Sequence, residues 1–329
     1  MNTTDHGDPF DVNLADLREV LDRVGGSAGP RVVAVVVTWN SGDHIGDCLD
    51  SIRRSALPVA TLVVDNASSD GTAAIVEQRG DPDVVLIQTG ANLGYAGGNN
   101  LGLGLADTAG AGFAVIVNPD ATLDPNCIGK LVETLGTDTG IGLASPAICY
   151  VGSDRIWYAG SDVDPVSAAA DHLHEGDPLA SLPVAPYGTG RASGCVLAVA
   201  PGRLHDVGLL DERYFLYYEE TDWSIRVKEH GLGIVVVPSA VARHDVGHGS
   251  GGANPTYQYY MTRNRLLLAS QHGTRGAMGA LPGAFRNTVV TLIALARNHR
   301  KEFVPCLIAI GHGYVDFARG RFGRRLGGP

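Results

Sequence analysis

The chain has 329 residues, of which 44% are hydrophobic, and its formal net charge at pH 7 is −10. This apolar content is ample for a folded core and excludes a disordered protein, and the negative charge argues against a dedicated nucleic-acid-binding protein. The charge is unevenly spread, because the segment from Gly276 onward has eight basic residues and two acidic ones. That segment is therefore +6 and the rest is −16, an asymmetry that indicates an anionic partner for the tail.

The cysteine pattern and the hydropathy predict a reduced, cytoplasmic protein. The five cysteines are scattered and form no Cys-x-x-Cys pair, so neither a zinc site nor a disulfide framework is indicated. The N-terminus is acidic and lacks the apolar core of a secretory signal. No uninterrupted apolar run reaches the length of about 18 residues that a transmembrane helix needs, so we expect none.

The first part of the chain predicts one short helix ahead of the main domain. Residues 1–12 are predicted to be a disordered leader. Residues 13–24 place leucine and valine side chains at helical spacing and end before Gly25-Gly26. We expect this helix to pack on the main domain without a chemical role.

Buried strands and helices then alternate along the chain. Short apolar runs predict four strands, at 32–37, 61–64, 84–87 and 113–117. A helix at 43–55 follows the first strand, and another begins after the second, with Ser69 or Asp70 as its cap. After the fourth strand, Asp124 is the predicted N-cap and Pro125 the first helical residue. The alternation predicts an α/β fold, with a mostly parallel sheet flanked by helices.

The second half of the chain has a less regular pattern. Residues 150–191 predict a loop-rich excursion, or a hairpin, over the site. Apolar runs at 195–200 and 234–237 predict further strands, and the chain becomes helical after Tyr257. The predicted organisation is a leader with a short helix, a nucleotide-binding domain and a basic helical C-terminal extension. Their bounds are 1–29, 30–265 and 266–329.

Polar residues follow each of the four predicted strands. They are Thr38 and Asn40, Asp65 and Asn66, the Asn- and Gly-rich loop 92–100, and Asn118-Pro119-Asp120. Ligands bind beyond the carboxyl ends of parallel strands, so these corners predict a nucleotide-using site. Glycines 94, 97 and 98 let the backbone approach a ligand closely. The loop is neither G-x-G-x-x-G nor G-x-x-x-x-G-K, which disfavours a dinucleotide fold or a P-loop. Taken alone, Asn118-Pro119-Asp120 could equally be a turn that caps the next helix.

A second group of acidic residues lies within 210–223, where carboxylates alternate with aromatic residues just before a helix. These acids could simply complement the dipole of that helix. A carboxylate in a partly apolar pocket is also a reasonable general base, which makes Glu219, Glu220 and Asp222 candidates. His244 follows the last strand and could complete a metal site with Asp120, although a lone histidine is more often structural. His248 is interpreted as a structural or loop residue.

Residues 31–265 resemble an inverting family 2 glycosyltransferase with the GT-A fold, especially its rhamnosyltransferase-like branch. The matching motifs occur in the expected order. They are VVVTWNS (35–41), VVDNASSDGT (63–72), NLGYAGGNNLG (92–102), NPDATLDP (118–125), SGCVLAV (193–199), VGLLDERYFLYYEETDWSIR (207–226), VPSAVARHDVGHGS (237–250) and YMTRNRLL (260–267). The Gln-x-x-Arg-Trp motif of processive synthases is absent, so the resemblance implies transfer of one sugar per encounter.

The resemblance implies a role for each matching position. It implies that the donor's base, ribose and remaining parts contact residues at the strand ends and in the glycine-rich loop, namely Thr38, Asn40, Asp65, Asn66, Asn92, Gly94, Gly97, Asn99 and Asn118. Asp120 is the implied metal-binding carboxylate, with His244 as the second protein ligand. Asn118 replaces the first aspartate of the family's Asp-x-Asp motif, which removes one anionic ligand. Glu220 falls at the position of the general base, with Glu219 and Asp222 as neighbours.

The sequence therefore predicts a glycosyltransferase that uses Mg²⁺ or Mn²⁺ and a dTDP- or UDP-linked sugar. The favoured donor carries a deoxysugar such as rhamnose, and the acceptor is a glycan, a lipid-linked sugar or a small molecule. The alternatives are a UDP-hexose or UDP-HexNAc transferase of polysaccharide assembly, or a non-catalytic sugar-nucleotide-binding scaffold. A nucleotidyltransferase is disfavoured because its Lys/Arg-containing first loop is missing.

The basic tail contains two apolar runs, at 288–296 and 303–310, flanked by arginine and lysine. Both runs are too short to span a bilayer, but they suit an interfacial helix on an anionic leaflet. The alternative is a helical pair packed on the protein or in a homodimer. The predicted localisation is cytoplasmic, with peripheral contact at the inner face of the cell membrane as an option.

Overall fold

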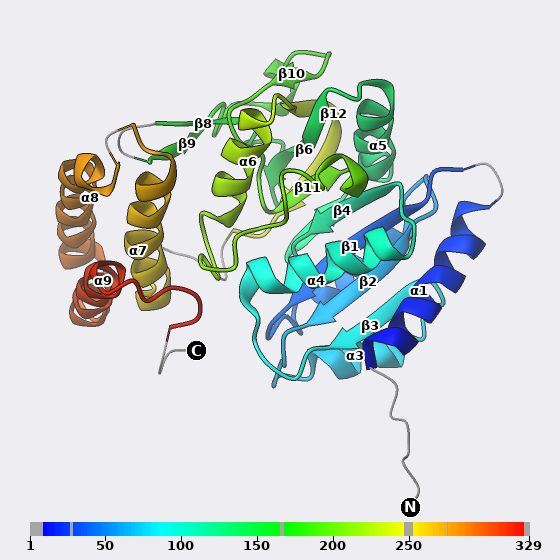
Figure 1. The fold of residues 1–329 in the computed structure, drawn as a ribbon, viewed down its shortest axis with the longest axis horizontal. Helices are drawn as coiled ribbons and strands as arrows, with labels where there is room; N and C mark the ends of the chain where they lie inside the picture. Colours follow the sequence, from blue (N-terminus) through cyan, green and yellow to red (C-terminus); the bar gives the residue numbers. More distant parts are fainter. Residues whose placement is uncertain (1–8, 27–28, 165–167, 247–252, 275, 326–329) are drawn as a thin grey trace, which may run out of the picture.

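The computed structural model describes residues 9–26, 29–164, 168–246, 253–274 and 276–325. His248 and the first part of the predicted leader lie outside these residues. A mixed sheet forms the centre of the molecule (Figure 1). The order of its strands is β10 (Tyr187–Gly188), β12 (Gly233–His244), β6 (Ile141–Tyr150), β11 (Val196–Val199), β4 (Phe113–Val117), β1 (Val32–Thr38), β2 (Ala60–Asp65) and β3 (Val84–Gln88).

Four pairs of neighbouring strands in this sheet run parallel, and the others are antiparallel, among them β10 with β12. β1 pairs in parallel with β2 and β4, β2 with β3, and β12 with β6, whereas β11 is antiparallel to both of its neighbours. Two short strands extend it, β5 (Ala121–Leu123) against β12 and β7 (Ile156–Tyr158) against β6. The four strands predicted from the first apolar runs are confirmed, each to within a residue at either end.

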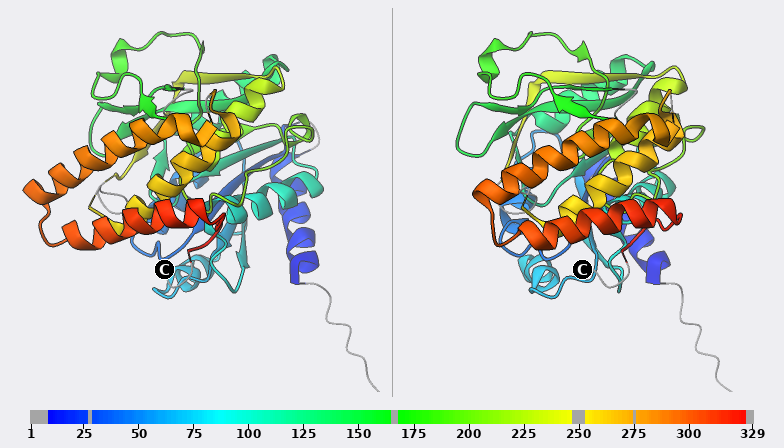
Figure 2. Two further views of the ribbon diagram at one scale, coloured as in Figure 1. Left: turned by 60° about the vertical axis from the view of Figure 1, so that its left-hand side comes forward. Right: turned by 90° about the vertical axis from the view of Figure 1, so that its left-hand side faces the viewer.

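Helices cover both faces of the sheet. One buried cluster joins it to α2 (Ile45–Arg53), α3 (Thr72–Arg79) and α5 (Cys127–Thr137). The other joins it to α1 (Pro9–Gly25), α4 (Gly94–Thr108) and α6 (Glu219–Glu229). The C-terminal helices α7 (Pro255–His272), α8 (Gly276–Asn298) and α9 (Phe303–Ala318) form a further layer beside this domain, as Figure 2 shows from two sides. The α/β prediction is confirmed, and the predicted boundary at 265/266 lies inside α7.

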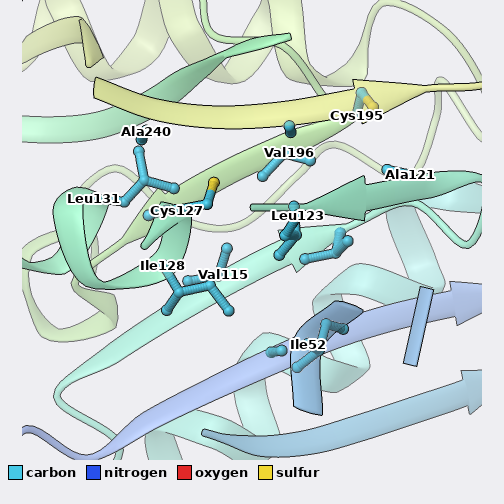
Figure 3. Packing of buried hydrophobic residues seen from close by; sticks show 14 of the residues in the cluster. Ile52, Val115, Ala121, Leu123, Cys127, Ile128, Leu131, Cys195, Val196 and Ala240 are labelled. Carbon is cyan, nitrogen blue, oxygen red and sulfur yellow. The ribbon is translucent and has the colours of Figure 1, made fainter. Parts of the chain in front are cut away.

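The core beneath α5 holds the strand that ends at the Asn-Pro-Asp turn. Figure 3 shows Ile128 and Leu131 of α5 close to Val115 of β4, and all three side chains are at most 1% exposed. Cys127 belongs to the same cluster, and all five cysteines are free and buried, as predicted. This packing fixes the end of β4, from which the candidate site is built.

Strand β6 was not predicted, because Gly142, Ser145 and Pro146 interrupt its apolar pattern. Proline is rare in a central strand because it cannot donate to the ladder. Here the neighbouring strand β12 shifts register between Val237, which lies opposite Pro146, and Val241. This irregularity is where the sheet accommodates the proline. The predicted hairpin after residue 150 is present as β8 (Ser161–Val163) and β9 (Ala170–His172).

Three local predictions were wrong. Helix α5 begins at Cys127 with Asn126 as its N-cap, because the Asp124 carboxylate pairs instead with Arg243 of β12. The N-cap of α3 is Gly71 in the left-handed region, although Asp70 Oδ1 still accepts a hydrogen bond from Thr72 N. The predicted glycine-rich loop is largely helical, since α4 begins at Gly94.

The tail also differs from the prediction. The apolar run at 288–296 is part of α8, a single helix of 23 residues. By length and composition, α8 is the one helix among the described residues that could cross a membrane. The predicted run was shorter because Arg286 and Asn287 interrupt the apolar sequence without ending the helix.

The glycines of α4 let this helix lie directly against β1. A Cβ added at Gly102 would come within 2.3 Å of Val35 Cγ1, and one at Gly98 within 2.6 Å of Val37 Cγ1. Val35 is fully buried in the middle of the sheet and cannot easily move. The glycines in the sequence therefore allow close helix–sheet packing at these two positions.

We predict opposite effects for two Gly→Ala changes in α4. Gly102→Ala should lower the free energy of unfolding by about 1–3 kcal/mol, because the added methyl overpacks against Val35. Gly104→Ala is the matched control, since no atom lies within 4 Å of its added Cβ. That variant should be more stable by about 0.5–1 kcal/mol, through helix propensity alone. Urea unfolding of both variants tests this, and equal midpoints would contradict the packing argument.

Candidate functional site

The ends of β1 and β2 form the first corner of the site. Thr38 Oγ1 donates to Asp65 Oδ1 at 2.9 Å, and Ser68 N donates to Asp65 Oδ2 at 3.0 Å. Thr38 and Asp65 are at most 1% exposed. Asn40 has a φ of 52° and its Oδ1 accepts from Ser69 N at 2.8 Å. The predicted donor-binding residues of this corner thus lie together, with Asn40 the exposed member and Asp65 ordering the turn.

The beginning of α4 forms the second corner. Asn92 Oδ1 accepts from Gly94 N at 2.8 Å, and Asn66 Nδ2 donates to Gly94 O at 2.9 Å. Asn99 is fully buried and donates to Tyr95 O. Asn66 and Asn99 therefore shape the backbone rather than line an open surface. Gly97 is buried on the first turns of α4, where an added Cβ would lie 3.0 Å from Leu93 Cβ.

Gly94 is constrained by the segment before α6. Its φ is +74°, and a Cβ there would lie 2.4 Å from Phe215 O. The same carbonyl accepts a hydrogen bond from Tyr95 N at 2.8 Å. Only glycine combines this backbone conformation with such a close approach. The second corner is thereby joined to the acidic segment.

The turn after β4 faces the end of β12. Asn118 N donates to Cys195 O, and Asn118 O accepts from Ala121 N, which closes the Asn-Pro-Asp turn. Asp120 Oδ1 then lies 3.3 Å from His244 Nε2. Both Asp120 Oδ1 and His244 Nδ1 are buried and have no hydrogen-bond partner among the described residues. The predicted pairing of Asp120 with His244 is therefore present in the structure.

The environment of His244 stabilises its charged form. Burial disfavours the imidazolium, but Cys195 and Asp120 outweigh burial and raise the pKa of His244 to about 10. Trp157 packs edge-on against the imidazole, with ring centroids 4.5 Å apart. A metal cation could face Asp120 in place of the imidazolium proton of His244. Carboxylate and imidazole suit Mn²⁺, and a carboxylate suits Mg²⁺.

The protein ligands for such a cation are few. Among the described residues there is no group of three or more His, Cys, Asp and Glu side chains that could hold a metal ion. Asn118 supplies no carboxylate. A cation at Asp120 and His244 would therefore take its remaining ligands from the bound donor and from water. The two atoms without hydrogen bonds, Asp120 Oδ1 and His244 Nδ1, fit a weak metal site that the bound donor would complete.

Glu219 and Glu220 begin α6 and have different environments. Arg191 Nη1 donates to Glu220 Oε1 at 2.6 Å, and the Glu220 side chain is 14% exposed. Glu219 is 3% exposed, and its Oε2 has no partner among the described residues. Burial, and then the charge of Glu220, raise the pKa of Glu219 well above its usual range. Glu220 is thus the reachable carboxylate, and Glu219 is the buried one whose pKa is raised.

Asp222 does not belong to this pair. It is fully buried, and its oxygens accept from Arg226 Nε at 2.8 Å and contact His272 Nε2 at 2.7 Å. Both contacts tie α6 to its own next turn and to the end of α7. The geometry therefore assigns Asp222 a structural role and does not support the predicted catalytic one.

The segment before α6 has an unusual backbone. Phe215, Tyr217 and Tyr218 all have positive φ, between 66° and 78°. Asn264 Nδ2 lies 2.8 to 3.0 Å from three carbonyl oxygens of this segment, those of Tyr214, Leu216 and Tyr217. Conformations of this kind persist only where neighbours over-determine them. We call residues 213–218 the strained segment.

Arg263 completes the hold on the strained segment. Its Nη2 donates to the carbonyls of Arg213 and Tyr214 at 3.0 and 2.9 Å, and its Nη1 donates to Gly323 O at 2.7 Å. Arg263 Nε also donates to Asn264 Oδ1 at 2.9 Å. Arg263 and Asn264 are at most 1% exposed. The Arg-Asn pair within the YMTRNRLL motif is thus a buried clamp.

Sequence reasoning missed three site residues. Arg191 and Trp157 lie in the loop-rich stretch, where no periodicity signals a role. Tyr95 was named only as part of a motif, yet its hydroxyl donates to Gly194 O at 2.5 Å. An added Cβ at Gly194 would lie 2.9 Å from Tyr95 Oη and 3.5 Å from Glu220 Cγ. One feature of the sequence could have indicated a role for Arg191. It is the only charged residue within a run of small residues, GTGRASG (188–194).

Comparison with known proteins gives the same assignment as the motifs. The family model described as glycosyl transferase family 2 matches residues 33–176. An N-acetylglucosaminyl-diphospho-decaprenol L-rhamnosyltransferase of Mycobacterium tuberculosis is 32% identical over 244 residues, which are 66% of this chain and 76% of that protein. The dTDP-rhamnosyl transferase RfbF of Shigella flexneri is 23% identical over 286 residues, 83% of this chain and 91% of that one.

The fold comparison extends over nearly the whole chain. The mannosyltransferase PcManGT from Pyrobaculum calidifontis, solved in complex with GDP-Man and Mn²⁺, superposes with a TM-score of 0.56. It is 17% identical, and the match covers 95% of this chain and 96% of that one. This likeness shows the GT-A fold. Since the chain also covers most of a relative 32% identical to it, the protein belongs to glycosyltransferase family 2 and is a glycosyltransferase.

Proposed function

We propose that this enzyme transfers one deoxysugar, with inversion, from a dTDP-linked donor to a hydroxyl of a lipid-linked glycan. The observation that best supports this proposal is the arrangement at the sheet edge. Arg191 binds the partly exposed carboxylate of Glu220. Asp120 lies beside His244, and the buried atoms Asp120 Oδ1 and His244 Nδ1 have no hydrogen-bond partner among the described residues. Two relatives support the donor and acceptor classes, the N-acetylglucosaminyl-diphospho-decaprenol L-rhamnosyltransferase and the dTDP-rhamnosyl transferase. A lipid-linked acceptor would place the reaction at the cytoplasmic face of a membrane.

Glu220 is the proposed general base. The acceptor hydroxyl gives its proton to this carboxylate while its oxygen attacks the anomeric carbon, and the bond from that carbon to the diphosphate breaks. Arg191 binds Oε1, and no described residue hydrogen-bonds Oε2, which leaves this oxygen to take the proton. Burial, and then the charge of Glu220, raise the pKa of Glu219 and so disfavour a second negative charge beside the base.

Asp120 and His244 are the residues that would hold Mg²⁺ or Mn²⁺. The ion would neutralise the negative charge of the leaving diphosphate. Asp120 supplies the anionic ligand, while His244 must lose its proton before its nitrogen can bind. Asn118 closes the turn that positions Asp120. Thr38, Asn40, Asp65, Asn66, Asn92, Gly94, Gly97 and Asn99 are proposed to form the donor pocket, directly or by shaping its backbone.

The two neighbouring glutamates should respond differently to the same substitution. Glu220→Gln removes the base and should lower kcat by about 10²–10⁴-fold, while donor binding is retained. Glu219→Gln replaces a buried acid, whose raised pKa favours the neutral form, by a neutral amide of the same shape, so its kcat should remain within a few-fold of the wild-type value. Steady-state transfer assays on both variants check this. A larger loss in Glu219→Gln than in Glu220→Gln would reverse the assignment.

Metal binding should release a proton. Because the pKa of His244 is about 10, the free imidazole is protonated near neutral pH and must deprotonate when a cation binds. Calorimetric titration of Mn²⁺ with a nucleoside diphosphate present, in buffers of different ionisation enthalpy, should report about one proton released. The affinity should therefore rise with pH below about 10.

Two variants separate the ligands in this experiment. His244→Ala should bind the cation more weakly and release no proton. Asp120→Ala should lose the metal dependence of donor binding altogether. If His244→Ala released as many protons as the wild type, His244 could not be the titrating ligand.

A donor panel tests the sugar and nucleotide. With Mn²⁺ present, dTDP-rhamnose should raise the Tm of the full chain more than UDP-glucose, UDP-GlcNAc or GDP-mannose. A larger shift with a UDP sugar would instead favour the hexose or HexNAc transferase. Donor hydrolysis that disappears in Glu220→Gln would distinguish either enzyme from a non-catalytic scaffold.

A further inference from the structure

Helices α8 and α9 carry most of the large apolar side chains that the molecule exposes. Ten of the sixteen described residues of this kind lie between 276 and 318. Those of α8 include Met278, Leu281, Phe285, Val289, Val290 and Ile293; those of α9 are Val304, Leu307, Ile308 and Val315. Isolated surface apolar residues need no explanation, but a concentration on two adjacent helices indicates an interaction surface. We call this set the apolar surface.

The spacing within α8 shows that the apolar surface forms a stripe. Met278, Leu281, Phe285, Val289 and Ile293 follow one another at intervals of three or four residues, so they share one face of the helix. Phe285 is 67% exposed and Met278 77%. Ala280, Ala284 and Leu295 are buried and mark the opposite, inward side of the helix. The stripe therefore points away from the rest of the protein.

The charges on α8 itself are all positive, and the first acidic residue after it is Glu302, the N-cap of α9. Residues 276–301 contain Arg286, Arg297, Arg300 and Lys301 and no acidic residue. All four cations are exposed. Arg286 and Arg297 lie eleven residues apart, about three helical turns, and so flank the stripe on the same side. An apolar stripe bordered by cations matches the boundary between acyl chains and anionic headgroups.

We propose that the apolar surface of α8 and α9 lies flat in the headgroup region of an anionic bilayer. This inference rests on the proposed function, because membrane binding would bring the site to a lipid-linked acceptor. A second copy of the chain is a less suitable occupant. Packing one α8 stripe on another about a two-fold axis would bring Arg286, Arg297 and their copies together without a compensating acid.

The same residues argue against a helix that crosses the bilayer. Although α8 has 23 residues, Arg286 and Asn287 lie near its middle and would sit at the centre of the hydrocarbon. A charged side chain there is costly. The helix is also held to the protein, because Thr288 hydrogen-bonds with Tyr314 of α9, and Ala280 and Ala284 pack with residues of α7. A helix lying along the surface keeps both sets of contacts.

Binding of the full chain to vesicles tests the inference. We expect sedimentation with vesicles that contain phosphatidylglycerol, weaker binding to pure phosphatidylcholine, and further weakening at high salt. Phe285→Glu should reduce the partition coefficient about tenfold or more, because a large apolar side chain is lost from the interface. Val184→Glu is the matched control: Val184 is 93% exposed but lies outside α8 and α9, so this variant should bind like the wild type.

A charge variant and a measurement in solution complete the test. Arg297→Gln with Arg300→Gln should reduce the preference for phosphatidylglycerol while binding to phosphatidylcholine stays unchanged. Equal binding by Phe285→Glu and Val184→Glu would overturn the proposal. So would sedimentation velocity showing a dimer that Phe285→Glu dissociates, together with no vesicle binding.

Vesicle binding and the proposed reaction can be tested independently. Phe285 is 67% exposed on the outward side of α8 and has no part in the proposed site, so donor hydrolysis by Phe285→Glu should equal that of the wild type. Loss of vesicle binding with intact hydrolysis would support the surface and leave the chemistry untouched. An enzyme inactive on every donor, but still bound to anionic vesicles, would reject the proposed function alone.

Discussion

The buried clamp formed by Arg263 and Asn264 is the constraint on which the site depends. It holds the strained segment, in which three non-glycine residues adopt positive φ at a cost of roughly 1–3 kcal/mol each. That segment sets where α6 begins, and thus where Glu219 and Glu220 lie. Its Phe215 carbonyl also accepts from the first residues of α4. One pair of side chains therefore positions both the proposed base and the first turn of α4, which belongs to the proposed donor pocket.

The clamp is stable because its own polar groups are satisfied. Arg263 is almost fully buried, and within the described residues it donates to carbonyl oxygens instead of pairing with a carboxylate. Its guanidinium also lies over the rings of Tyr259, Tyr260 and Phe322, at 4.9 to 6.0 Å from their centroids. Carbonyl dipoles and aromatic faces offset the loss of hydration without fixing a negative charge near the site. The clamp therefore adds no negative charge beside Glu220, the proposed base on α6.

The sequence predicted the alternating half of the sheet and the polar corners well, because apolar runs and strand-end turns are local signals. It could not predict β6, whose proline is tolerated only through the irregular pairing of β12 with that strand. The residue pattern alone also could not separate Asp222 from Glu220, since the difference lies largely in contacts with His272 and Arg191, which are distant in sequence. Asp120 and His244, which the sequence analysis placed at one site, do lie 3.3 Å apart, whereas their role as metal ligands stays a prediction.

The contact between Gly323 and the clamp has a consequence for how the enzyme is made. Gly323 N donates to Arg213 O, and Gly323 O accepts from Arg263. During synthesis strands β1 to β4 and helix α4 emerge first and can begin to fold, whereas the strained segment must wait for residues that the ribosome adds much later. The nascent protein would thus fold the first part of the proposed donor pocket before the proposed base is in place. Activity would begin only when the C-terminal segment docks.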